Sequence, residues 1–344
     1  GEGEIALSKL VATLDRFPDI PDGIQGTAYI DSSDNFHSNG FGEKSELEYI
    51  PRPTWDKYPM QRYATTGSYL YRSMAVNTDR IIQWTTSRGC PFSCAFCASG
   101  VSARYKSMAQ VENELQEIYA RFLPSFMVWQ DNLTIPDRKR CFEFCEMLER
   151  NAFPFRYYVS GHAGTMDREM LKALKESGCA GIMYGVESAN DRILEAMNKK
   201  QTVEQLEAVI RWTKEAGIIP QLSGMFGYPG ETTEDFKRTL DMVLSGFDRD
   251  HPGSNNLCPN PVRIFPGTKL YGYAIEQGII EDMEDYYRKY FGKNCNYIGL
   301  CEEPEEQVVY FHHLARFLNE RQYHASFLAN YDTKLKEAGF FERS

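Results

Sequence analysis

The sequence predicts an α/β protein built around a partial (β/α)6 barrel of the TIM-like type, with an irregular N-terminal arm and a helical C-terminal extension. From residue 80 onward, short apolar stretches alternate with amphipathic helical patterns at intervals of roughly 30–45 residues, which is typical of parallel βα units. A glycine-rich or polar turn follows each apolar stretch. The length of 344 residues and the hydrophobic fraction of 42% are sufficient for one such barrel with appendages.

Residues 1–77 are expected to form an arm rather than a free-standing domain. Apolar residues recur there at helical spacing (Ile5, Leu7, Leu10, Val11 and Leu14), and Pro18 and Pro21 end the helical pattern. Residues 26–30 and 47–50 have the composition of short strands. Residues 51–56 are expected to be an extended connector, because proline disfavours helix in the residue before it.

The barrel is expected to occupy residues 78–272. Its predicted strands are 81–86, 126–130, 155–160, 181–186, 218–226 and 260–265. Its predicted helices are 109–122, 137–151, 167–177, 191–197, 203–216 and 233–245. Six units are fewer than the eight of a closed barrel, which favours a barrel open on one side. Residues 273–344 are predicted to be a helical extension, with helices at 305–320 and 323–338 that pack on the barrel and cover its open side.

Composition narrows the class of protein. The net charge of −10 argues against a broad nucleic-acid-binding surface. No apolar run approaches the roughly 20 residues of a membrane helix, and the acidic start does not resemble a secretory signal. Nine cysteines, three of them clustered, favour metal binding in a reducing compartment over a disulfide framework. We therefore expect a cytoplasmic protein without a membrane or nucleic-acid partner.

Three cysteines directly follow the first predicted strand. Cys90, Cys94 and Cys97 are spaced by four and three residues, which is typical of a loop that holds an iron–sulfur cluster. A [4Fe–4S] cluster usually takes four cysteines, so three leave one iron open to a non-protein ligand. The alternative is three small buried hydrophobic residues. Gly89 and Pro91 around the first cysteine, and Phe96 before the last, favour the cluster.

Polar and glycine-rich residues recur where the other predicted strands end. These turns are 130–134, 160–164, 185–188, 224–232 and 263–268. In parallel βα architectures the chemistry lies at the carboxyl ends of the strands. We therefore expect the five turns to face the cysteine loop and to form a ligand site with it.

The cysteine spacing, with Phe96, resembles the radical S-adenosylmethionine (SAM) superfamily. The runs 185–188, 227–232 and 265–268 resemble the branch whose members usually carry an N-terminal cobalamin-binding domain. The opening Gly-Glu-Gly-Glu resembles the end of that domain, and residues 51–56 resemble the linker behind it. The domain itself is not among these residues. Three alternatives remain: a sequence that lacks it, a partner chain that supplies it, or an enzyme that works without cobalamin.

The resemblance implies roles for individual residues. Cys90, Cys94 and Cys97 would hold a [4Fe–4S] cluster whose fourth iron chelates SAM. The residues implied to contact SAM are Phe96, Gln130, Asp131, Asn132, Glu187, Ser188, Gly224, Gly227, Arg263 and Phe265. Carboxylates suit the cationic amine of SAM, and glycines allow close approach of the backbone. Asp131 and Asn132 could instead be turn formers, and Glu187 a surface carboxylate.

The function implied by the resemblance is reductive cleavage of SAM to a 5′-deoxyadenosyl radical, which abstracts hydrogen from a small metabolite. Because no cobalamin domain is in the sequence, we expect dehydration or redox change on a sugar-like or antibiotic precursor. The alternative is a cobalamin-dependent radical SAM C-methyltransferase, and a different class is a non-catalytic iron–sulfur electron carrier or scaffold. The protein would orient the reactants and exclude water and oxygen, with flavodoxin or ferredoxin as reductant.

Several further residues have two interpretations. His162 and Tyr184, at strand ends, are candidate catalytic residues, although a structural histidine and a packed tyrosine are the alternatives. Cys141 and Cys145, four apart on a predicted helix, are expected to pack in the core. A second cluster held by Cys258, Cys295 and Cys301 is a minor alternative.

Overall fold

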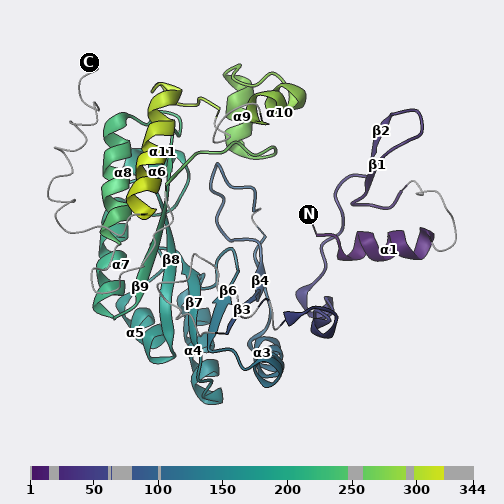
Figure 1. The fold of residues 1–344 in the computed structure, drawn as a ribbon, viewed down its shortest axis with the longest axis vertical. Helices are drawn as coiled ribbons and strands as arrows, with labels where there is room; N and C mark the ends of the chain where they lie inside the picture. The colour runs from purple at the N-terminus through teal and green to yellow at the C-terminus, as the bar shows by residue number, and fades with distance from the viewer. Residues whose placement is uncertain are drawn as a thin grey trace.

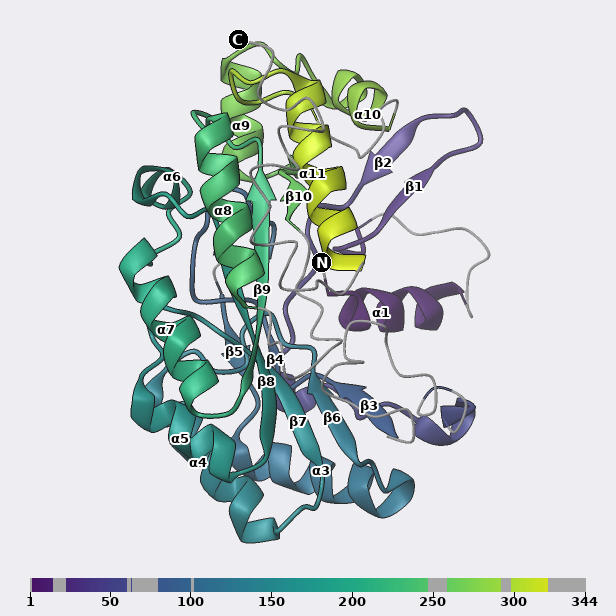
Figure 2. The same cartoon turned by 60° about the vertical axis from the view of Figure 1, so that its left-hand side comes forward.

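The computed structural model describes residues 2–14, 23–60, 63, 80–99, 102–246, 259–291 and 298–320. At its centre is a six-stranded sheet in the order β10-β9-β8-β7-β6-β3, in which every neighbouring pair is parallel. Each unit therefore adds one strand beside the previous one. Figures 1 and 2 show a curled sheet with its helices along the outer side. This arrangement confirms the predicted partial barrel.

The predicted barrel elements are present, with small shifts at their ends. The strands are β3 (Ile81–Trp84), β6 (Phe126–Trp129), β7 (Arg156–Gly161), β8 (Cys179–Glu187), β9 (Ile219–Phe226) and β10 (Asn260–Pro261). The helices are α3 (Met108–Phe122), α4 (Arg138–Asn151), α5 (Arg168–Glu176), α6 (Asp191–Ala196), α7 (Val203–Glu215) and α8 (Thr233–Ser245). β10 is shorter than predicted, because its neighbour β9 ends at Phe226 and Gly227, at φ 86°, turns away.

Local signals in the sequence fix where the helices begin. The residue before each of the six helices uses its side chain to accept a backbone N–H of the first turn; these residues are Ser107, Asp137, Asp167, Asn190, Thr202 and Thr232. At Thr202 and Thr232 a complete capping box forms. Each cap fixes the start of its helix at the next residue.

Alternation along the strands separates a packed outer face from an inner face. Tyr157, Ile182 and Leu222 belong to the core between the sheet and the helices. Side chains alternate across a strand, so their neighbours in sequence point to the inside of the barrel. The inner face carries a smaller apolar cluster that includes Val128 and Tyr158. The strand ends above this cluster form the candidate site.

The N-terminal arm consists of α1 (Glu4–Leu14) and a hairpin of β1 (Ala28–Ile30) and β2 (Phe36–Ser38), followed by two 3-10 turns, η1 (Leu47–Tyr49) and η2 (Trp55–Lys57). The predicted strand at 47–50 is wrong. No described strand pairs with that segment, and the Tyr49 N–H instead bonds to the carbonyl of Glu46 at 3.0 Å.

The C-terminal extension contains α9 (Lys269–Glu276), α10 (Met283–Phe291) and α11 (Glu305–Glu320). α11 packs on the barrel as predicted, against α8, β9 and β10. The Phe311 ring lies 5.7 Å from the ring of Phe226 and 5.4 Å from that of Phe236. The helix predicted at 323–338 lies outside the described residues. None of the described helices has the length and apolarity needed to cross a membrane.

Candidate functional site

The cysteine loop follows the first barrel strand and is held from two sides. After β3 the chain forms β4 (Ser87–Arg88), passes through the cysteines, and returns as β5 (Arg104–Tyr105), which pairs antiparallel with β4. Inside the loop, the Ala95 N–H donates to the carbonyl of Met197 at 2.8 Å, and the Leu270 N–H donates to the carbonyl of Ala95 at 2.9 Å. The loop is therefore clamped between the end of α6 and the start of α9.

The three thiols fit an iron–sulfur cluster. Cys90 and Cys94 are half-buried, Cys97 is exposed, and none of them forms a disulfide. Burial raises the pKa of Cys90 and of Cys94, and the neighbouring thiols raise both further. The Ser99 N–H donates to the Cys97 Sγ at 3.4 Å, as expected of a thiol that is to carry negative charge. Within the described residues no three ligands surround a single ion, but a multi-iron cluster holds its thiolates further apart.

A buried ion pair lies beside the thiols. The Lys199 Nζ is 3.0 Å from the Glu187 Oε1, and the two side chains are only 11% and 13% exposed. Burial lowers the pKa of Lys199, but Glu187 and the thiols of Cys94 and Cys90 outweigh it, so its pKa lies above the usual value. Both members of the pair also act on the pKa of Cys94. The structure thus brings Glu187 to the cysteine loop, as predicted, together with a lysine that the sequence analysis missed.

The backbone around the ion pair is specialised. Glu187 has a φ of 63°, a left-handed conformation that non-glycine residues rarely adopt, at a bulge in the pairing of β8 with β9. A Cβ on Gly185 would lie 2.3 Å from the Glu187 Oε1 and 2.7 Å from the Lys199 Nζ. The ion pair therefore fills the space that a side chain at position 185 would occupy.

His162, a predicted catalytic residue, forms hydrogen bonds through both ring nitrogens, and its catalytic role stays a prediction. Its Nδ1 accepts the Gly164 N–H at 3.1 Å, so its Nε2–H donates to the carbonyl of Lys199 at 2.9 Å. Its ring stacks on Phe92 of the cysteine loop at 4.0 Å. Burial, and then the charge of Lys199, lower the pKa of His162 to about 4. The neutral imidazole has both nitrogens occupied and links the loop to the Lys199 segment.

Asp131, whose cosubstrate role stays a prediction, is bonded to the segment that leads into the cysteine loop. Its carboxylate accepts the backbone N–H groups of Thr86 and Ser87 and the Thr86 hydroxyl, each at 2.7 Å. Burial raises the pKa of Asp131 despite these bonds. The adjacent Gln130 and Asn132 are exposed, and the Gln130 Nε2 donates to the Gln83 Oε1 at 3.1 Å. Cosubstrate roles for Gln130 and Asn132 stay predictions.

Two further predicted site residues are fully buried. Tyr184 is fully buried, and its hydroxyl bonds to the Thr213 Oγ1 at 3.0 Å, in the layer between the sheet and α7. Ser188 is also fully buried, and its hydroxyl donates to the Glu231 Oε1 at 3.2 Å. Glu231 also accepts the Tyr228 N–H at 2.8 Å, and burial raises its pKa to about 8. The predicted roles of Tyr184 and Ser188 stay predictions.

The remaining predicted cosubstrate residues divide by orientation. A Cβ on Gly224 would lie 3.2 Å from side-chain atoms of Thr239 and Val243, so this glycine permits close packing of α8. Arg263 and Phe265 are exposed and alternate with the buried Val262 and Ile264. Their side chains therefore point away from the packed layer.

Phe96 and Gly227 lie next to the same end of the barrel. Phe96 packs against the apolar cluster that joins the barrel to the C-terminal helices. Gly227 ends β9 in a left-handed conformation. The cosubstrate contacts of Phe96, Gly227, Arg263 and Phe265 stay predictions.

The other cysteines do not form a visible second centre within the described part of the chain. Cys141 and Cys145 are buried in the core, as predicted. Cys258 and Cys295 lie outside the described residues, so the alternative of a second cluster is untested. Cys301 is half-buried, and its Sγ contacts the carbonyl of Glu303 at 3.9 Å.

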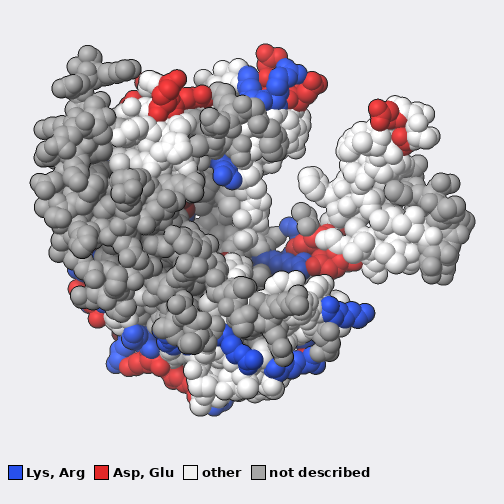
Figure 3. All heavy atoms as spheres, viewed as in Figure 1, with Lys and Arg blue, Asp and Glu red and all other residues white. Residues whose placement is uncertain are grey.

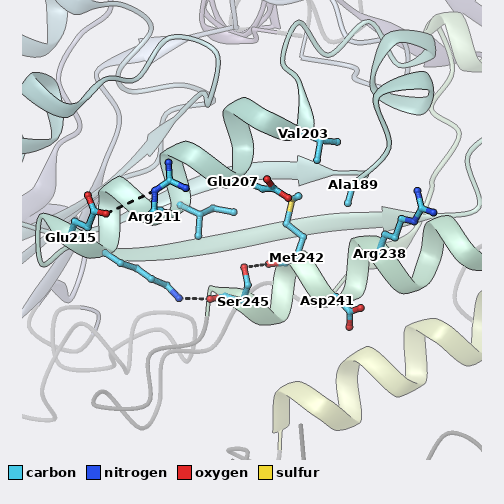
Figure 4. A pocket seen from close by; sticks show the side chains of 11 residues that line it. Ala189, Val203, Glu207, Arg211, Glu215, Arg238, Asp241, Met242 and Ser245 are labelled. Atoms are coloured by element: carbon cyan, nitrogen blue, oxygen red, sulfur yellow. Dashed lines mark hydrogen bonds and ion pairs between the residues drawn. The ribbon is translucent and has the colours of Figure 1, made fainter. Parts of the chain in front are cut away.

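A surface groove of about 720 Å³ lies elsewhere, between α7 and α8 on the outside of the barrel (Figure 4). Its apolar floor includes Val203 and Met242, and charged residues of both signs form its rim. Lys214 at the rim bonds to the carbonyl of Ser245. The groove has none of the residues that gather at the strand ends, so the candidate site remains at the cysteine loop.

The partial barrel and the three-thiol loop after its first strand can be compared with known proteins. Residues 84–243, a little under half of the chain, match the family model described as the radical SAM superfamily. It is 28% identical to an uncharacterized methyltransferase of Pyrococcus horikoshii, over 84% of this chain and 60% of that protein. It is 26% identical to the cytidylyl-2-hydroxyethylphosphonate methyltransferase of Streptomyces wedmorensis, over 76% of this chain and 49% of that protein. The chain thus spans about half the length of these relatives.

Two solved structures share the fold. The radical SAM methyltransferase TsrM from Kitasatospora setae, with tryptophan and a SAM analogue bound, superimposes with a TM-score of 0.60 at 20% identity, over 80% of this chain and 53% of that chain. The cobalamin-dependent SAM radical enzyme OxsB, with aqua-cobalamin and SAM bound, superimposes with a TM-score of 0.55 at 20% identity, over 88% of this chain and 41% of that chain. At this identity the two likenesses concern the fold.

Proposed function

We propose that this chain is the radical SAM part of a cobalamin-dependent C-methyltransferase that acts on a small metabolite. The observation that carries the proposal is the placement of three clustered thiols and the Glu187–Lys199 ion pair at one end of the barrel. The methyltransferase names of the relatives favour methyl transfer over the dehydration or redox change expected from the sequence.

Cys90, Cys94 and Cys97 would hold a [4Fe–4S] cluster, which supplies one electron to the sulfonium of SAM when both are bound. The protein's own residues bind and orient. SAM ends in an amino acid group with one ammonium and one carboxylate, and Glu187 and Lys199 offer the complementary charges side by side. Because both side chains are largely shielded from water, each charge acts more strongly than it would in bulk solvent. Gly185 leaves the space in which the pair sits.

Cobalamin would be held by a further domain, on this polypeptide or on a partner, and would carry the methyl group. A small protein reductant such as flavodoxin or ferredoxin would supply electrons to the half-exposed cluster. The relatives are about one and a half times as long as this chain.

The test of the radical SAM chemistry is anaerobic reconstitution with iron and sulfide, followed by reductant and SAM. We expect a [4Fe–4S] spectrum and SAM-dependent release of 5′-deoxyadenosine. Cys94→Ala should lose both, whereas Cys141→Ala, which changes a thiol in the core, should keep both. A reconstituted cluster that neither cleaves SAM nor responds to it in its EPR spectrum would overturn the proposal and favour an electron carrier.

The test of methyl transfer is the fate of a labelled SAM methyl group when cobalamin is added under reducing conditions. Transfer of the label, with formation of S-adenosylhomocysteine, is expected. If 5′-deoxyadenosine forms at the same rate with or without cobalamin and no label is transferred, hydrogen abstraction followed by dehydration or redox change is the better assignment.

A further inference from the structure

The two-residue ribbon that leads into the cysteine loop carries an electrostatic conflict. In the antiparallel pair of β4 and β5, Arg88 lies directly opposite Arg104. Like charges opposite each other destabilise a strand pair. The two side chains are only 32% and 17% exposed, so water screens their repulsion weakly. A ribbon this short cannot offset that repulsion by its own pairing.

The ribbon determines where the loop begins. Only Gly89 separates Arg88 from Cys90, and Gly89 has a φ of 78°. A Cβ at Gly89 would lie 2.4 Å from the carbonyl oxygen of Ser102, on the returning strand segment. The backbone at Cys90 is therefore packed directly against the other side of the ribbon, and a movement of the ribbon moves Cys90.

Two carboxylates from the N-terminal arm neutralise the ribbon. Glu2 forms ion pairs with both arginines, at 3.1 Å to the Arg88 Nη1 and in closer contact with the Arg104 Nη2. Glu4, the first residue of α1, pairs with the Arg88 Nη2. The group has two positive and two negative charges, and Glu2 bridges the two strands. Figure 3 shows blue and red atoms in contact where the arm meets the barrel.

The arm contacts the same ribbon a second time. The Arg104 Nη1 donates to the carbonyl of Ser45, and the Lys44 Nζ donates to the Ser102 Oγ at 2.6 Å. On its other side, the ribbon is held to the barrel by the bond from the Ser87 N–H to Asp131. The start of the cysteine loop is thus fixed between the barrel on one side and the arm on the other.

We propose that Glu2, Glu4, Arg88 and Arg104 form an arm latch that positions the Cys90 end of the cluster-binding loop. The latch makes the seating of the N-terminal arm a condition for an ordered cluster site. The four side chains are positioning residues that act through the ribbon. The proposal rests on the assignment of Cys90 as a cluster ligand and deepens it.

The experiment uses the whole chain without its cluster, under reducing conditions. Glu2→Gln combined with Glu4→Gln keeps the shapes of the side chains and removes both negative charges. Hydrogen exchange over residues 86–97 and the alkylation rate of each cysteine, measured by mass spectrometry, report the order of the loop. We expect the exchange at residues 87–90 and the alkylation of Cys90 to rise about tenfold, the ratio expected when charge-assisted bonds of this kind are lost.

Two further variants make the result specific. Glu43→Gln removes the arm's exposed ion pair with Lys9, at 3.2 Å, and should leave exchange and alkylation unchanged. Adding Arg88→Gln to the double glutamine variant removes the repulsion between Arg88 and Arg104 across the ribbon. This addition should return the alkylation of Cys90 toward the wild-type rate, which a merely structural loss would not do.

The proposal is overturned if the alkylation rate of Cys90 in the double glutamine variant stays within twofold of the wild-type rate. It is also overturned if exchange rises equally throughout the barrel, because the residues would then support only global stability. Both readouts are independent of iron and SAM. A failure of the latch is therefore distinguishable from a failure of the proposed function, which is judged by SAM cleavage.

Discussion

Replacing Gly185 with alanine should weaken the binding of SAM and leave the fold intact. The new Cβ would occupy the space of the Glu187–Lys199 ion pair, at 2.3 Å from one partner and 2.7 Å from the other. Both atoms are ends of flexible side chains, so the pair can move apart without displacing the sheet. Gly185 does not have a positive φ, so the backbone accepts alanine without strain.

The size of the effect follows from burial. At a separation of 3.0 Å the pair makes a charge-assisted hydrogen bond in a site with little water. Displacing it should cost about 1–3 kcal/mol of interaction with a bound amino acid group. This corresponds to a roughly 5- to 150-fold loss of affinity for SAM. Global stability should fall by less, because the displaced side chains can reach solvent.

The assay is titration of SAM against the reduced, reconstituted protein, followed by the change in the EPR signal of the cluster. Gly272→Ala is the control, because a Cβ there, in α9, meets nothing within 4 Å. We expect Gly185→Ala to keep its iron content and its unfolding midpoint within a few degrees, and to lose affinity for SAM. Wild-type affinity in Gly185→Ala would refute the assignment of the ion pair as the cosubstrate anchor.

Substitutions at three other residues test the scaffold around the site. His162→Phe should keep the ring contact but lose the bond to the Lys199 carbonyl, which should lower the free energy of unfolding in urea by about 1–2 kcal/mol. A loss of turnover beyond a thousandfold at unchanged SAM affinity would instead support the predicted catalytic role. Asp131→Ala should lower the free energy of unfolding by about 2–4 kcal/mol, since three donors lose their acceptor. Asp131→Asn should bind SAM with an affinity within twofold of wild type. Burial raises the pKa of Glu231 to about 8 from a usual 4.5, so the folded state binds a proton there that the unfolded chain has released. The free energy of unfolding of the wild type, measured relative to that of Glu231→Gln, should therefore fall as pH rises from 4.5 to 8. If the two proteins show the same pH dependence of unfolding across that range, the raised pKa is contradicted.

Local sequence signals predicted most of the barrel. Alternating apolar stretches and N-terminal caps such as Asp137 and Thr232 act within a few residues, so the strands and helices were predicted almost to their ends. The cysteine loop was predicted for the same reason, since its spacing is local. The strand at 47–50 was predicted wrongly because strand formation depends on a partner strand that composition does not reveal.

The bonds of the predicted site residues could not be read from the sequence. The sequence placed Asp131, His162 and Ser188 at strand ends, where the structure has them, and the structure adds their bonds to Thr86, Lys199 and Glu231. Such pairings join residues that are 37 to 45 positions apart. Lys199 was missed because it follows a short helix rather than a strand, and only the fold brings it to Glu187.

The charged groups at the strand ends form two kinds of bonds and are expected to have two kinds of role. Asp131 and Glu231 use their carboxylates on backbone N–H groups, and His162 uses both nitrogens, so all three fix the geometry of loops. The Glu187–Lys199 pair instead consists of two side-chain charges, which a ligand with its own ammonium and carboxylate can exchange for new partners at little electrostatic cost. Substitutions in the first group should therefore change stability more than affinity, and substitutions around the pair should do the reverse. That contrast, measured in one set of variants, locates the cosubstrate without a bound structure.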